Sequence, residues 1–180
     1  LIEDKLGNQF RERRPLTPSL SPGGGEGARR AGEGKRAKSY RERFEQVFGE
    51  RPSAQNAAKA LASYKSIYWI AGGRAKEGGL DPVFPHLGNV KRAFLIGEAS
   101  GRFARELDGR VALEQCGELK KALASALAAA QDDNAKDAVV LLSPACASFD
   151  QFTNFEARGE AFRRLVGELT ARRKAGERVQ

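Results

Sequence analysis

The sequence predicts an α/β fold, with a Rossmann-like, mainly parallel sheet flanked by helices. Two observations lead to this prediction. Apolar runs such as Val139 to Leu142 are too short and too β-branched for a helix, and they are typical of strands buried on both faces. These runs alternate with longer helical segments, and strands that alternate with helices form parallel sheets through right-handed crossovers.

The expected elements begin near residue 55 with an alanine-rich helix. The expected strands carry the apolar runs and lie at 66–71, 90–97, 110–114 and 138–142. The expected helices lie at 55–64, 80–87, 100–107 and 117–131, and Pro82 and Pro85 interrupt the second of them. A last helix is expected to start near Asp150 or Gln151, because one apolar stripe runs through Phe152, Phe155, Phe162, Val166 and Leu169.

Small residues join the last strand to the last helix. They leave backbone N–H groups at the expected helix N-terminus free to meet a carboxylate or phosphate, and the helix dipole adds to the attraction. Ser148 adds a hydroxyl and is most simply the N-cap of this helix. The sequence therefore predicts a place for an anion at the carboxyl end of a strand, where ligands of parallel sheets bind.

Two segments carry a resemblance to a known family. Residues 143–162, SPACASFDQFTNFEARGEAF, resemble the C-terminal signature of the Mur ligases that add D-glutamate to UDP-N-acetylmuramoyl-L-alanine. Residues 67–76, IYWIAGGRAK, resemble the GGxxK segment of the same family. The resemblance covers about residues 57–169. It implies that residues 51–180 form the third, D-glutamate-binding domain of a three-domain enzyme.

The resemblance implies an ADP-forming amide ligase of peptidoglycan synthesis, which serves cell-wall biogenesis, cell shape and division. It also implies a D-glutamate site made by Lys76, the Ser148 hydroxyl, the Phe149 backbone N–H and Phe155 as a pocket wall. No catalytic or metal-binding residue is expected in this chain. Without the resemblance, Lys76 is most simply a solvated loop lysine, and Phe155 fits core packing at least as well as substrate contact.

The parts of the family that handle the nucleotide belong to its two preceding domains. ATP and Mg²⁺ serve the full-length family, and neither is expected to bind this chain alone. The family also opens its third domain with a strand followed by a lysine and a threonine, where this chain has Glu50 and Pro52. We therefore expect a truncated or rearranged copy that lacks this first strand and is inactive by itself.

Residues 1–50 are expected to be an extension outside the family. Residues 15–27 are rich in Pro, Gly and Ser and offer little apolar surface to offset the entropy of ordering, so disorder is expected. A short helix is expected at 35–48. The net charge of +8 is spread along the chain, and the basic stretch 11–43 lacks the interleaved aromatic residues that stack on single-stranded bases. A solvated basic arm is therefore favoured over a nucleic-acid-binding module.

The remaining features bound the function class. The sequence has no apolar run of about 18 residues and no signal peptide at its first residue, so we expect a cytoplasmic protein without a membrane partner. A monomer is expected. Cys116 and Cys146 form no metal-like pair, and Cys146 is interpreted as a compact buried thiol. Two alternatives to a ligase domain stay open: a non-catalytic binding or regulatory remnant, and the nucleic-acid-binding module.

Overall fold

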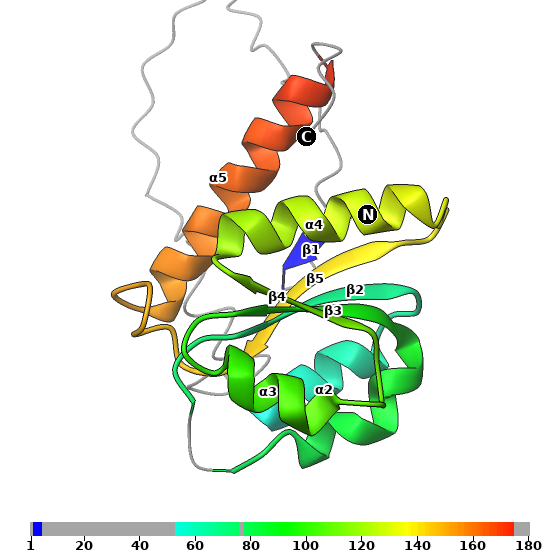
Figure 1. The fold of residues 1–180 in the computed structure, drawn as a ribbon. Coiled ribbons are helices and arrows are strands. Elements are labelled where there is room, and N and C mark those ends of the chain that lie inside the picture. Colours follow the sequence, from blue (N-terminus) through cyan, green and yellow to red (C-terminus); the bar gives the residue numbers. More distant parts are fainter. Residues whose placement is uncertain (1, 5–52, 76–77, 175–180) are drawn as a thin grey trace, which may run out of the picture.

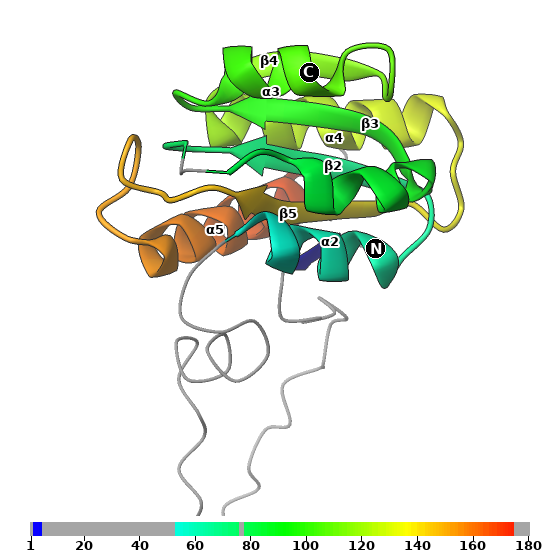
Figure 2. The ribbon, with the colours of Figure 1, turned by 90° about the horizontal axis from the view of Figure 1, so that it is seen from below.

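A computed structural model describes residues 2–4, 53–75 and 78–174 of the chain. These residues form a five-stranded sheet in the order β1-β5-β2-β3-β4, and every neighbouring pair is parallel. Figure 2 shows the strands in this order. The strands are β1 Ile2–Asp4, β2 Ile67–Gly72, β3 Val90–Ile96, β4 Leu113–Gly117 and β5 Val139–Ala145. The predicted parallel α/β fold is confirmed.

Helices cover both faces of this sheet (Figure 1). One face carries α2 Ala54–Ala62, the 3₁₀ helix η1 Asp81–Asn89 and α3 Ser100–Leu107. The other face carries α4 Leu119–Asp132 and α5 Phe155–Lys174. Within the described ranges, no helix is long and apolar enough to cross a bilayer.

The central strands are apolar throughout because both of their faces are buried. In β2, Ile67 and Trp69 pack with the core under α2 and α3, whereas Tyr68 and Ile70 pack with the core under α4 and α5. All four side chains are fully buried. The indole N–H of Trp69 donates to the carbonyl oxygen of Ser143 at 2.8 Å, so this aromatic residue also ties β2 to β5. The continuous apolar runs in the sequence thus reflect a two-sided core.

Two predicted boundaries are wrong. The strand expected at 110–114 lies at Leu113–Gly117, because the chain first makes a turn in which Arg110 and Val111 both donate to the Leu107 carbonyl. The last helix starts at Phe155, not near Asp150 or Gln151. An apolar stripe fixes the face of a helix that packs inward, but it does not fix the residue at which the helix starts.

One strand comes from the N-terminal segment that was expected to lie outside the family. Residues Ile2–Asp4 form β1 and pair in parallel with Val140–Leu142 of β5, so this edge of the sheet has a partner over three residues. Pairing at an edge satisfies backbone groups that are otherwise open to other chains. The expected disorder at 15–27 and the expected helix at 35–48 lie outside the described residues.

Candidate ligand-binding site at the carboxyl ends of the strands

Three turns meet at one end of the sheet. They follow β2, β3 and β5, which are adjacent and parallel, so their carboxyl ends lie at the same edge. The turns comprise residues 72–75, 97–99 and 145–152. In open α/β sheets this edge is where ligands bind.

The turn after β2 needs two glycines. Gly72 and Gly73 both have φ of +126°, a conformation that other residues rarely adopt. A Cβ on Gly72 would clash with the carbonyl oxygen of Ile96, and a Cβ on Gly73 would clash with that of Ala147. These close approaches allow the Gly73 N–H to donate to Ile96 at 3.0 Å and the Arg74 N–H to donate to Ala147 at 3.0 Å. The glycine pair therefore lies between the ends of β3 and β5.

The turn after β5 contains two of the predicted ligand groups. The Ser148 carbonyl accepts hydrogen bonds from the N–H groups of Gln151 at 3.2 Å and Phe152 at 2.9 Å, which closes the turn. Ser148 is only 2% exposed, whereas the Phe149 side chain is 63% exposed. Among the described residues, no partner is found for the Ser148 hydroxyl or for the Phe149 N–H. Neither donor is thus used in closing the turn, although the Ser148 side chain is nearly buried.

Asn154, not Ser148, caps α5. The Asn154 side-chain oxygen accepts from the Ala157 N–H at 2.7 Å, and its carbonyl accepts from the Arg158 N–H at 3.4 Å. The prediction that Ser148 is the N-cap is wrong, because the closed turn at 148–152 occupies the residues that were expected to start the helix. Phe155 is the first helical residue and is half-buried.

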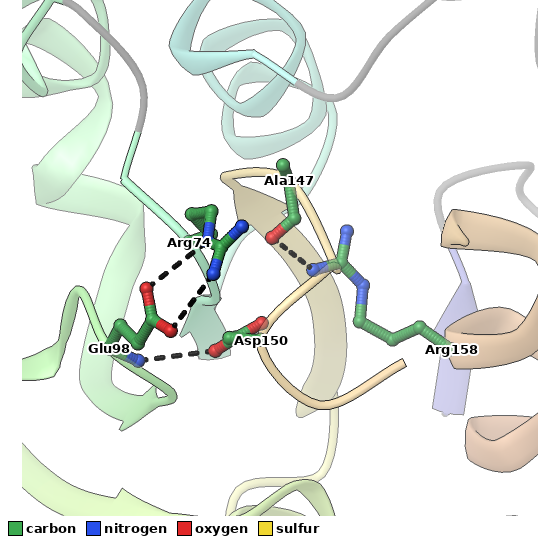
Figure 3. Close-up of polar contacts among 5 residues, drawn as sticks. All are labelled: Arg74, Glu98, Ala147, Asp150 and Arg158. Carbon is green, nitrogen blue, oxygen red and sulfur yellow. Dashed lines mark hydrogen bonds and ion pairs between the residues drawn. The ribbon is translucent and has the colours of Figure 1, made fainter. Parts of the chain in front are cut away.

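Two polar contacts join the turn after β3 to the other two turns (Figure 3). A carboxylate oxygen of Asp150 accepts from the Glu98 N–H at 3.1 Å and lies against Gly97, where a Cβ would collide with it. The Glu98 carboxylate in turn pairs with the Arg74 guanidinium at 3.3 Å. Both side chains of this ion pair are 56% exposed, so it adds little stability.

A small cavity of about 80 Å³ lies beside these turns. Its lining includes Ala145 at the end of β5 and Cys146 just after it, Gly78 and Gly79, and the first residues of α2. Ser53 caps that helix, with its hydroxyl accepting from the Asn56 N–H at 3.2 Å. A space of this size admits several water molecules or a small polar group.

Comparison with curated proteins identifies the matching enzymes. The chain is 54% identical over 114 residues to a protein of Paramagnetospirillum magneticum named UDP-N-acetylmuramoylalanine--D-glutamate ligase. It is 50% identical over 125 residues and 51% identical over 117 residues to proteins of the same name from Rhodospirillum rubrum and Nitrobacter hamburgensis. The chain is homologous to a segment of these ligases.

The homologous segment is a minor part of each ligase. The three alignments cover 63%, 69% and 65% of this chain but only 25%, 26% and 25% of the relatives. The chain thus spans about a quarter of the length of the ligases that it matches. No family model matches the chain.

The structure places three of the four residues that the resemblance to these ligases predicts. Ser148 and Phe149 lie in the turn after β5, and Phe155 follows at the start of α5. Lys76 lies outside the described residues, two positions beyond Arg74 in the turn after β2. Their contact with D-glutamate stays a prediction.

The sequence analysis missed Arg158. Its side chain is buried at 3% exposure, and it donates to the carbonyl oxygens of Cys146 at 3.1 Å and Ala147 at 3.3 Å. A signal was available, because position 158 falls between Phe155 and Phe162 on the apolar stripe of the last helix. A charged residue on an inward-facing stripe indicates a buried polar contact.

The two thiols are unsuited to nucleophilic chemistry. Cys146 is 1% exposed, which confirms the interpretation of a compact buried thiol. Cys116 is also buried, and burial together with the Glu114 carboxylate raises its pKa to about 11. A thiol with this pKa is protonated at neutral pH, and the thiolate is the nucleophilic form.

No group of three or more His, Cys, Asp or Glu side chains in ranges 2–4, 53–75 and 78–174 is placed to hold a metal ion. We therefore assign no step to Mg²⁺ in this part of the chain.

Proposed function

We propose that the chain is the C-terminal, D-glutamate-binding domain of a ligase that adds D-glutamate to UDP-N-acetylmuramoyl-L-alanine in peptidoglycan synthesis. We further propose that it has no ligase activity by itself. The observation that carries the proposal is the pairing of the glycine turn after β2 with the turn after β5, in a segment about half identical to these ligases. This arrangement brings both motifs of the resemblance to one edge of the sheet.

The residues of this edge suit a small dicarboxylate. In the proposed site, the Ser148 hydroxyl and the Phe149 N–H donate to one carboxylate of D-glutamate. Lys76 pairs with the other carboxylate, and Phe155 packs against the carbon chain between them. Since Asn154 caps α5 and the helix starts at Phe155, the donors at 148 and 149 act as individual hydrogen-bond donors and not as the first amides of a helix.

The domain's part in catalysis is to orient the amine of D-glutamate. In the complete ligase reaction, ATP transfers its terminal phosphoryl group to the alanyl carboxylate and is released as ADP. The amine of D-glutamate then attacks this acyl phosphate, and the amide forms as inorganic phosphate leaves and the nitrogen loses a proton. Positioning and electrostatics supply most of the acceleration in phosphoryl transfer. The groups that position ATP and Mg²⁺ are expected in the other domains of the ligase. The proposed partners of the complete enzyme are therefore D-glutamate, UDP-N-acetylmuramoyl-L-alanine and ATP with Mg²⁺.

A titration of the ¹⁵N-labelled chain with D-glutamate, followed by NMR, tests the proposed site. We expect shifts at the amides of Ser148 and Phe149 and a dissociation constant of roughly 1 mM or weaker, equivalent to about −4 kcal/mol. Lys76→Ala is expected to weaken binding roughly tenfold or more, because a charge-assisted hydrogen bond contributes about 1.5 to 3 kcal/mol. Lys91→Ala, an exposed lysine at the opposite end of β3, is the matched control.

Two results would contradict the proposal. Binding that is unaffected by Lys76→Ala would contradict the proposed site. Chemical-shift changes confined to residues far from the turn after β5 would contradict it as well. Release of ADP by the purified chain supplied with ATP, Mg²⁺, D-glutamate and UDP-N-acetylmuramoyl-L-alanine would remove the claim of catalytic incompleteness.

A further inference from the structure

Arg158 is a charged side chain in a place where charge is costly to bury. It lies in the first turns of α5 and is 3% exposed, among apolar residues of the same stripe. Removing a guanidinium from water is unfavourable unless strong hydrogen bonds replace its solvation. The residue is therefore expected to have a specific structural task.

The guanidinium reaches both turns that carry the predicted site. Nη2 donates to the Cys146 carbonyl at 3.1 Å, and Nη1 donates to the Ala147 carbonyl at 3.3 Å. Nη1 also lies 3.5 Å from the carbonyl oxygen of Gly72, at the end of β2. Figure 3 shows the side chain extending from α5 toward Ala147. One planar group thus spans the last residue of β2 and the residues just before Ser148.

The glycine turn leaves room for this group. A Cβ on Gly73 would come within 3.1 Å of Arg158 Nη1, in addition to its clash with Ala147. The Asn154 cap fixes where α5 starts and hence the direction in which Arg158 projects. The two glycines, the Asn154 cap and Arg158 thus all help to shape the carboxyl ends of β2 and β5.

We propose that Arg158 is a positioning residue that holds the turns after β2 and β5 together and so fixes the ligand donors at 148 and 149. The part concerning D-glutamate rests on the proposed function. Lysine does not replace it, because an ammonium is a compact point charge, whereas the planar guanidinium donates in several fixed directions at once. The ligand itself is contacted by other groups.

The test compares Arg158→Lys and Arg158→Gln with Arg164→Gln. Arg164 lies on the same helix, is 69% exposed and pairs with Glu168 at 3.1 Å, and in the described part of the chain its side chain makes no hydrogen bond to the turns after β2 and β5. Each folded variant is titrated with D-glutamate by NMR, and its thermal unfolding is recorded. In the absence of ligand, hydrogen exchange is followed at the Arg74 N–H, which donates to Ala147.

We expect both Arg158 variants to bind D-glutamate about tenfold more weakly than the Arg164 variant, since small misplacements of a site cause losses of this order or larger. Exchange at the Arg74 N–H is expected to accelerate by about tenfold or more, as local opening becomes easier. A purely structural role would lower the unfolding temperature without changing affinity in the folded protein.

Unchanged exchange at Arg74 in both Arg158 variants would overturn the inference, as would accelerated exchange with wild-type affinity. A wild-type chain that fails to bind D-glutamate would overturn the proposed function instead. In that case, accelerated exchange at Arg74 would still support the structural part, in which Arg158 holds the two turns together.

Discussion

Gly72→Ala is the sharpest test of how the strand ends are built. The residue has φ of +126°, and an added Cβ would collide with the backbone carbonyl of Ile96, which is not free to move aside as a flexible side chain is. Forcing an L-residue into such a conformation costs about 1 to 3 kcal/mol. Overpacking against neighbouring atoms adds about 1 to 3 kcal/mol. We therefore expect a loss of about 4 kcal/mol.

This loss is a large part of the total stability of a domain, which is about 5 to 15 kcal/mol. With a urea dependence of about 1 to 3 kcal/mol per molar, the unfolding midpoint is expected to fall by about 2 M. Fluorescence reports the transition directly, because the single tryptophan of the chain, Trp69, is fully buried in β2. The readout therefore lies in the strand that ends at the substituted glycine.

Gly167→Ala is the matched control. Gly167 lies in α5, and a Cβ built there meets nothing within 4 Å. In a helix, alanine is about 1 kcal/mol more favourable than glycine, so this variant is expected to be slightly more stable than the wild type. A Gly72→Ala midpoint equal to that of the wild type would refute the argument that the turn requires glycine.

Three further predictions follow from other contacts. Burial and the hydrogen bond to Asp133 raise the pKa of Tyr68 to about 12. Because this pKa exceeds the value of about 10 expected in the unfolded chain, the protonated phenol stabilises the folded protein. This stabilisation is complete below pH 10 and is lost as the pH rises toward 12. Urea titrations from pH 9 to 12 should show this fall, and it should be smaller in Tyr68→Phe. Cys116 and Cys146 are buried, so a thiol reagent at pH 8 should modify them only after unfolding, and rapid modification of the native chain would contradict the geometry. Asn154→Ala should cost about 1 kcal/mol through the lost helix cap, measured by thermal unfolding with Asn154→Ser as the conservative control.

The sequence alone was sufficient to predict the main layers of the fold. Strands β2 and β5 are apolar at consecutive positions because helices cover both faces, and a short, β-branched apolar run is typical of such a buried parallel strand. The position of the candidate site was also predictable, since the carboxyl ends of parallel strands share one edge. The two adjacent glycines after β2 indicate a turn from the sequence alone. The sequence does not show which carbonyl oxygens lie against these glycines.

Tertiary structure decided the remaining features, because each depends on contacts between residues distant in sequence. The helix α5 starts at Phe155, later than expected, because residues 148–152 form a closed turn and Asn154 is the cap. The pairing of Ile2–Asp4 with β5 joins segments separated by more than a hundred residues, and no local sequence pattern predicts this pairing. The contacts of Arg158 likewise exist only once α5 packs beside the ends of β2 and β5. Local periodicity determined which segments are buried, and the packing of those segments against one another determined where each turn closes and which polar groups meet there.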